Sequence, residues 1–173
     1  NQLDPQKFNP KLALPFSLRR EDFAAAVQDV YDFFYDMNTG LAAKSLDRLD
    51  DTGREVVRAA SASGRRVGHD MLAAVVDLPP ADLDEGLRRA VETNILVAGE
   101  DRYAFRHALL GEAVYDDLLP GERVRLHGRY ADALRSGAAS GAAAELARHA
   151  RLALDLDTAL SASIQAGHEA SAV

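Results

Sequence analysis

Five histidines are the residues best suited to chemistry in this 173-residue chain, which contains no cysteine. They are His69, His107, His127, His149 and His168. None forms an H-x-x-x-H pair with another. The sequence therefore predicts no metal site.

Motifs for catalysis are also missing from the sequence. ATP hydrolysis on a P-loop scaffold needs G-x-x-x-x-G-K-[ST], because backbone amides hold the phosphates while the lysine and hydroxyl handle the terminal phosphate and magnesium. The chain contains no Gly-Lys pair, no Gly-x-Ser-x-Gly elbow and no acidic-x-Lys cluster after a Pro-Asp. We expect no catalytic residue here, and we predict that the chain by itself is not an enzyme.

Composition indicates a folded protein without a membrane segment. The net charge is −7, from 20 basic and 27 acidic residues, and 47% of the residues are hydrophobic. No apolar run approaches the ~20 residues that span a bilayer, and the first five residues, Asn-Gln-Leu-Asp-Pro, do not resemble a secretory signal. We expect a cytoplasmic protein. Because the first residue is not methionine and the last stretch stops inside a helical pattern, we also expect a segment of a longer protein.

Residues 1–45 differ in composition from the rest. All three lysines and five of the six phenylalanines fall in this part, whereas 15 of the 17 arginines follow residue 45. We predict a proline-rich lead plus an amphipathic helix, which is either a fused, foreign segment or a plug at one end of a single core. The helix, residues 21–37, carries an apolar stripe formed by Phe23, Val27, Val30, Tyr31 and Phe34. This stripe needs a partner surface within the chain, the commoner case, or on a second copy through self-association.

Residues 46–136 predict three helices followed by a β-hairpin. The first helix has Leu46, Leu49, Val56, Val57 and Ala60 on one face. The second covers 68–77, and the third begins with Asp82 and Glu85 in capping-box spacing and turns Leu83, Leu87, Ala90 and Val91 inward. Two short runs, 95–98 and 102–105, then flank a three-residue loop that starts with Gly99. Three helices and a hairpin in this order indicate a mainly α winged-helix domain.

Helices resume after the hairpin. Leu110, Val114 and Leu118 mark one helix, and Val124, Ala131 and Leu134 mark the next, after a break at Pro120-Gly121. Residues 137–173 then predict an antiparallel helical hairpin, with Leu146 and Ala150 on its first helix and Leu156, Ala159, Leu160, Ser163, Ile164 and Gly167 on its second. Such a hairpin is the unit of a helical-repeat array.

Several stretches carry a family resemblance. They are 105–115 (FRHALLGEAVY), 119–123 (LPGER) and Leu126-His127, together with 46–49 (LDRL), 145–149 (ELARH) and 166–170 (AGHEA). Residues 46–173 resemble LuxR-type (MalT-like) ATP-dependent transcriptional regulators of the STAND class. That family places an AAA+ ATPase module first, then a winged helix, a TPR-like repeat arm and a DNA-binding helix-turn-helix. Related modules also occur joined to cyclase or kinase domains.

The resemblance implies a non-catalytic regulatory module that couples the nucleotide state of an ATPase domain to a repeat arm. Its partners would be those two parts of the same parent protein, and it would meet DNA only through a C-terminal domain outside this chain. ATP or ADP would bind in the parent. His107, with its neighbour Arg106, is the implied sensor of the ADP β-phosphate; the alternative is a histidine that satisfies local backbone groups. Both residues precede a predicted helix, whose N-terminal dipole also favours an anion.

Two other functions compete with this interpretation. A DNA-binding winged helix would need a basic third helix, but residues 81–94 carry four acidic and two arginine side chains. A piece of a restriction-endonuclease-like protein is suggested faintly by residues 1–45 alone.

Two smaller clusters are also candidate sites. Asp116 and Asp117 could pair with Arg123 or Arg125, although solvated carboxylates are the commoner case. The aromatic residues Tyr103, Phe105, Tyr115 and Tyr130 could form a binding patch, although such positions usually belong to a core.

Overall fold

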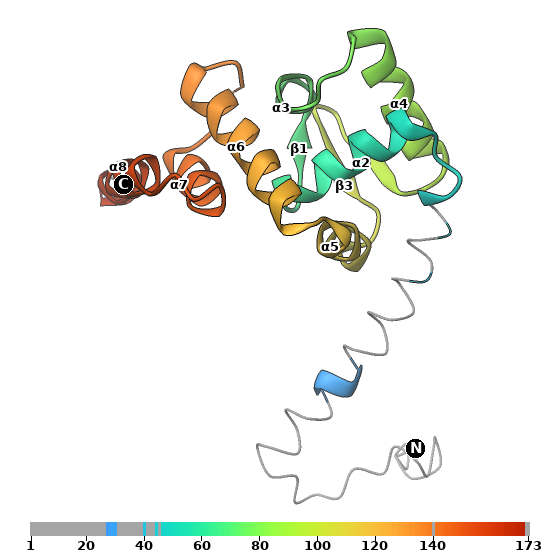
Figure 1. The fold of residues 1–173 in the computed structure, drawn as a ribbon, viewed down its shortest axis with the longest axis horizontal. Coiled ribbons are helices and arrows are strands. Elements are labelled where there is room, and N and C mark those ends of the chain that lie inside the picture. Colours follow the sequence, from blue (N-terminus) through green and yellow to red (C-terminus); the bar gives the residue numbers. More distant parts are fainter. Residues whose placement is uncertain (1–26, 31–39, 41–43, 45, 140, 172–173) are drawn as a thin grey trace, which may run out of the picture. The chain divides into compact units, whose positions relative to one another are not determined.

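A computed structural model of the chain describes residues 27–30, 40, 44, 46–139 and 141–171. The chain divides into two compact units, Asn1–Met37 and Asn38–Val173. Within the described residues, the second unit is mainly helical and holds a small three-stranded antiparallel sheet (Figure 1). None of the described helices is long and apolar enough to cross a membrane.

The described elements of the second unit agree with most of the predicted helices and with the predicted hairpin. They are α2 (Asp51–Ser63), β1 (Val67–Gly68), α3 (His69–Val75), α4 (Pro80–Glu92), β2 (Leu96–Ala98), β3 (Arg102–Phe105), α5 (Ala108–Asp117), α6 (Pro120–Ser136), α7 (Ala143–Leu152) and α8 (Leu156–Ser171).

The first predicted helix begins later than its apolar pattern suggested. The Asp50 side chain accepts a hydrogen bond from the Gly53 amide at 2.8 Å, which caps α2 and sets its start at Asp51. Leu46 and Leu49 therefore precede the helix, but Leu49 is still buried in the core and Leu46 packs against it. The spacing of apolar residues thus predicted correctly that Leu49 is buried, but it placed the start of the helix too early.

The predicted capping box at the start of the third helix is wrong. Helix α4 begins at Pro80, whose fixed φ suits a first helical position. Glu85 instead binds Arg88 and Arg89 within the same helix, at 2.6 and 3.0 Å. The helix thus begins at the second of two prolines and not at the expected acidic capping residue.

The sheet contains a strand that the sequence did not predict. Strands β2 and β3 form the predicted hairpin, with Leu96 opposite Phe105 and Ala98 opposite Tyr103. Strand β1 pairs with the other edge of β3, so the order is β1-β3-β2. A two-residue strand is too short for an alternating pattern that would predict it from the sequence. It is defined only by its pairing with β3.

One apolar core joins the helices α2–α6 to this sheet. Its most deeply buried large side chains include Val56, Leu72, Leu83, Ile95 and Leu96. Leu83, Leu87 and Ala90 of α4 are buried as predicted, and Val91 lies at the edge of the core. Helix α2 approaches α4 closely at Gly86, where an added Cβ would lie 3.0 Å from the Val56 side chain.

Helix α6 lies between this helix–sheet part and the hairpin of α7 and α8 (Figure 1). A second, small cluster packs between α6, α7 and α8. It consists of Ala131, Ala150 and Ala159, with Leu146 at its edge. The predicted α7–α8 hairpin is present, with small residues at the close approach.

The predicted inward face of α8 is partly wrong. Ala159 and Ala162 are buried, whereas Leu156, Leu160 and Ile164 are 54–66% exposed. The two sets lie on different faces of the helix, so the larger side chains form an apolar stripe on the outside. The short Ala side chains allow α7 and α8 to approach, which is why they rather than the leucines face inward.

Four residues of the predicted 21–37 helix are described. Residues 27–30 are helical, and the side chains of Val27 and Val30 are exposed. The rest of the predicted stripe, Phe23, Tyr31 and Phe34, lies outside the described residues, as do residues 1–26 with the proline-rich lead.

Candidate functional site

Arg106 and His107 lie at the junction between β3 and α5. The Arg106 amide donates to the Ile95 carbonyl at 3.0 Å, and His107 is the N-cap residue of α5 in an extended conformation. Both residues are exposed, and neither side chain has a hydrogen-bond or ion-pair partner among the described residues. The first turn of α5 contains no acidic residue. The two basic side chains therefore face solvent at an uncompensated helix N-terminus.

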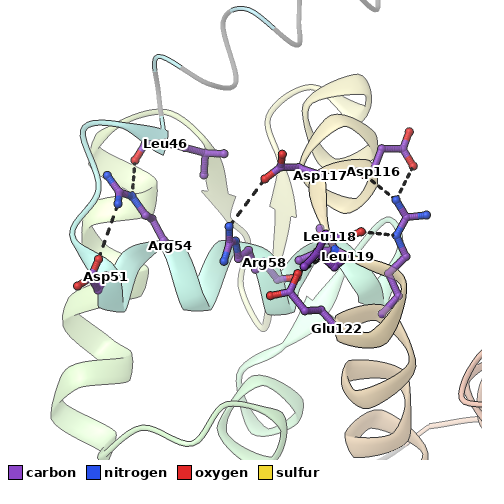
Figure 2. A network of polar contacts seen from close by, with 11 residues as sticks. Leu46, Asp51, Arg54, Arg58, Asp116, Asp117, Leu118, Leu119 and Glu122 are labelled. Carbon is purple, nitrogen blue, oxygen red and sulfur yellow. Dashed lines mark hydrogen bonds and ion pairs between the residues drawn. The ribbon is translucent and has the colours of Figure 1, made fainter.

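A groove lined by residues of α2, α3 and α6 carries charges of both signs, some of which are paired. Arg54 contacts Asp51 at 3.7 Å and donates to the Leu46 carbonyl at 3.1 Å, while Arg58 contacts Asp117 at 3.8 Å (Figure 2). Its wall carries four arginines and three acidic residues. This balance gives the groove little preference for either sign of ligand.

Asp116 and Asp117 are exposed, as predicted, and the pairing considered between Asp116 and Arg123 is also present. The Arg123 guanidinium contacts the Asp116 carboxylate at 3.7 Å and donates to its carbonyl at 2.6 Å (Figure 2). Asp117 pairs with Arg58 of α2. The Arg123–Asp116 pair lies across the turn between α5 and α6, and the Arg58–Asp117 pair links α5 to α2. Each pair contributes about 0–1 kcal/mol to stability because water screens it.

The aromatic residues considered as a patch do not form one exposed surface. Tyr130 is fully buried, and its hydroxyl donates to the Ala59 carbonyl of α2 at 2.8 Å. Burial raises the pKa of the Tyr130 hydroxyl well above its usual range. Tyr103, Phe105 and Tyr115 are half-buried against the core. The interpretation of these positions as core is confirmed.

A chain of hydrogen bonds, buried at its centre and part-buried at its two ends, crosses the helices α5, α6 and α7. The Tyr115 hydroxyl lies 2.8 Å from Nε2 of His127, and Nδ1 of His127 lies 2.8 Å from Nδ1 of His149. Nε2 of His149 lies 2.7 Å from Nη2 of Arg148. The Tyr130 ring stacks on His149 at a centroid distance of 4.5 Å. We call the first four residues, Tyr115, His127, His149 and Arg148, the histidine relay.

Arginine fixes the direction of every hydrogen bond in the relay. A guanidinium only donates, so Nε2 of His149 accepts and its proton sits on Nδ1. That proton is donated to Nδ1 of His127, which places the His127 proton on Nε2 and directs it to the Tyr115 oxygen. Each neutral imidazole thus has one donor and one acceptor satisfied. The hydroxyl hydrogen of Tyr115 remains available for another acceptor.

Both histidines are neutral in this arrangement. Burial, together with the nearby positive charge of Arg148, lowers the pKa of His127 to about 4. The same causes, with His127 as an additional one, lower the pKa of His149 to about 3. A proton added to the Nδ1 acceptor of His127 would set two N–H donors against each other, so the relay and a charged His127 are incompatible.

Arg148 connects the relay to the end of α2. Its Nη2 donates to the Ser63 carbonyl at 2.6 Å and more weakly to the Ala62 carbonyl at 3.3 Å. These carbonyls belong to the last turn of the helix, where the dipole is negative and a cation is stabilising. The relay therefore joins α2, α5, α6 and α7 through one continuous set of polar contacts.

Sequence reasoning treated these two histidines separately and missed their pairing. A usable signal was present, because His127 lies on the face of α6 that carries Val124, Ala131 and Leu134, and His149 lies three residues after Leu146. Histidines on apolar faces must find buried partners. No group of three or more potential metal-binding side chains occurs among the described residues.

Comparison with known proteins gives one informative match. No family model matches the chain, and no solved structure matches it. An uncharacterized protein from Rhizobium meliloti (strain 1021) is 34% identical over 128 residues, a match that covers 69% of this chain and 12% of the relative. The chain therefore spans about an eighth of the length of the curated relative that it matches, so its similarity is to one part of a much longer protein.

Proposed function

We propose that residues 46–173 are a non-catalytic regulatory module of a LuxR-type, STAND-class ATP-dependent transcriptional regulator. In this proposal, residues 46–136 form a winged-helix domain, and residues 137–173 begin a TPR-like repeat arm. The module couples the nucleotide state of an ATPase domain, which lies elsewhere in the same parent protein, to the arm.

The arrangement of the described elements supports this proposal. Helices α2, α3 and α4 precede the β2–β3 hairpin, the order of elements in a winged helix. The α7–α8 hairpin follows, and its exposed stripe of Leu156, Leu160 and Ile164 suits a next helical repeat that would bury it. The match to a small part of a much longer relative is consistent with a module of a multidomain protein.

The observation that carries the proposal is the exposure of Arg106 and His107 without a side-chain partner. Both are exposed at the N-terminus of a ten-residue helix, and the described part of the chain engages neither side chain. Two cationic or neutral donors beside a positive helix end suit a phosphate group presented by a neighbouring domain. The alternative role for His107, satisfaction of local backbone groups, receives no support, because its side chain makes no capping hydrogen bond.

Direct DNA binding by the third helix is disfavoured. Helix α4 carries Asp82, Asp84, Glu85 and Glu92 against two arginines. Glu85 binds both of those arginines, and Arg89 also contacts Asp50 at 3.5 Å. An acidic helix whose cations are already paired would repel the phosphate backbone.

The test is ADP binding by the full-length parent protein. His107→Ala removes one phosphate contact and should weaken ADP affinity by about ten- to hundredfold, the equivalent of ~1.5–3 kcal/mol for a hydrogen bond to a charged group. Weaker ADP retention should shift the parent toward its active state. His168→Ala is the matched control, since His168 is exposed on α8. Equal ADP affinity of both variants and the wild type would contradict the sensor role.

A further inference from the structure

A cavity of about 850 Å³ opens where the end of α2, strand β3, α5 and α7 meet. This volume lies in the range of small-molecule sites, roughly 300–1,000 Å³. The wall residues that matter here are Arg65, Arg66, Phe105, Tyr115, Arg148 and Leu152. Arg106 and His107 do not line it. The cavity therefore lies beside the two residues proposed to contact a nucleotide, between Phe105 and Ala108, and does not include them.

Positive charge dominates the wall of this cavity. Arg65, Arg66 and Arg148 face one carboxylate, that of Glu112, although the whole chain has a net charge of −7. Arg65 and Arg66 are exposed and form no side-chain hydrogen bond or ion pair with the described residues. Like charges gathered along the wall of a partly enclosed cavity favour an anionic ligand.

Arg148 is held in place while part of its donor capacity stays open. Its Nη2 contacts Ala62, Ser63 and His149. The Nε and Nη1 atoms of Arg148 have no hydrogen-bond partner among the described residues. Every buried side-chain nitrogen or oxygen atom in the described part of the chain does have a hydrogen-bond partner, so Nε and Nη1 must be accessible to solvent. A fixed arginine with open donors loses little conformational entropy when it binds an anion.

Both ends of the histidine relay present hydrogen-bond donors to the same cavity. Arg148 and Tyr115 are the two ends of the relay, and both line the cavity. Because the Tyr115 oxygen accepts from His127, the hydroxyl hydrogen is left to donate. The two ends thus offer donors only, a set that suits an anion rather than a neutral ligand with donors of its own.

Apolar groups cover much of the remaining wall. Phe105, Ala108 and Leu152 line it. The Phe105 ring packs directly on the backbone of α5, because an added Cβ at Gly111 would lie 2.8 Å from that ring. An apolar body can therefore lie beside the charged groups and remove this surface from water.

We propose that this cavity binds a small organic anion, with its carboxylate or phosphate group at Arg65, Arg66 and Arg148 and its apolar body against Phe105 and Leu152. The ligand would contact the loop after α2 and strand β3 on one side and α7 on the other. Its binding therefore stabilises the attachment of the α7–α8 hairpin to the helix–sheet part. This proposal goes beyond the regulatory function proposed above and does not depend on it.

Titration calorimetry with simple probes tests the proposal on the chain itself. Phenyl phosphate and phenylacetate combine an anion with an apolar ring, whereas inorganic phosphate and benzyl alcohol each supply only one part. We expect at least one of the two combined probes to bind ten times more tightly, or better, than both single-feature probes. If neither does, the cavity is not a site for organic anions.

Arginine variants locate the binding. Arg65→Gln and Arg66→Gln change exposed side chains, and each should weaken the combined probe by about tenfold, as expected for a lost charged contact. Arg151→Gln is the matched control, because Arg151 is exposed on α7 and does not line the cavity; it should change affinity by less than about twofold, the size of effect typical of a surface residue without contacts. Equal effects of all three variants would overturn the assignment. His107→Ala should leave probe binding unchanged, which separates this test from that of the nucleotide sensor.

Discussion

The helix–sheet part and the α7–α8 hairpin are held together by different forces. The helix–sheet part buries large apolar side chains such as Leu72, Leu83 and Ile95 in one continuous core. The hairpin is joined to α6 by a cluster of three alanines and by the histidine relay, while three large apolar side chains of α8 stay exposed.

This difference predicts different stabilities for the two regions. A fully buried Leu or Ile side chain contributes ~1.5–3 kcal/mol, whereas alanine offers only its methyl group, ~0.8 kcal/mol per buried carbon. The hairpin therefore depends more on polar contacts, and a hydrogen bond of this kind typically contributes about 0.5–1.5 kcal/mol.

The largest expected effect comes from the apolar core. Leu87→Ala should lower the free energy of unfolding by about 2–5 kcal/mol, because Leu87 is buried against the core and its loss leaves a cavity. Leu160→Ala on the exposed stripe should change it by less than about 0.5 kcal/mol. Urea unfolding of both variants measures this contrast. Similar losses in the two variants would show that the stripe of α8 is buried in solution.

The second largest effect is expected from acid, which should destabilise the histidine relay. An unfolded histidine takes up a proton near pH 6.5, whereas the folded pKa is about 4 for His127 and about 3 for His149. Between the folded and unfolded pKa values, the unfolded state therefore binds more protons than the folded state. The stability that comes from burying the two neutral histidines is complete above pH 6.5 and is lost as the pH falls below it. At pH 5 the loss should be roughly 2 kcal/mol per histidine.

Urea unfolding at pH 7 and pH 5 measures the effect, with variants that separate it from the titration of carboxylates. His149→Gln should remove about half of the histidine contribution to the pH dependence, whereas His168→Gln on the exposed face of α8 should leave it intact. If His149→Gln has the same pH dependence as the wild type, the histidine is not buried in its neutral form.

A smaller effect is expected where α6 is tied to α2. Tyr130→Phe removes the hydroxyl that donates to the Ala59 carbonyl and should lower the free energy of unfolding by about 0.5–1.5 kcal/mol. The ring stays in place, so its stacking on His149 is kept. A loss above ~3 kcal/mol, the size of a core truncation, would mean that this bond supports more of the joint than one hydrogen bond should.

The smallest expected effect is at the proposed sensor. His107→Ala and Arg106→Ala should each change the melting temperature of this chain little, within about 0.5 kcal/mol in stability, because neither side chain has a partner among the described residues. Thermal unfolding followed by circular dichroism is sufficient. A drop of several degrees would make His107 a structural residue and remove the support for a sensor.

The sequence by itself determined the local features of this protein. Apolar spacing predicted the buried face of α4 at Leu83, Leu87 and Ala90, and the glycine-containing loop at Gly99 predicted the β2–β3 hairpin. These features depend on residues that are close in the chain, so their pattern is visible in the sequence. The missing P-loop was equally visible, since that motif is contiguous.

Tertiary structure alone decided the features that join distant residues. Strand β1 exists because Val67 meets Tyr103, and the relay exists because His127 and His149, which are 22 residues apart, meet between α6 and α7. The choice of Ala159 over Leu160 as the inward side of α8 likewise depended on how closely α7 approaches. A single chain's pattern shows which residues need partners, but only the packing of whole helices selects those partners.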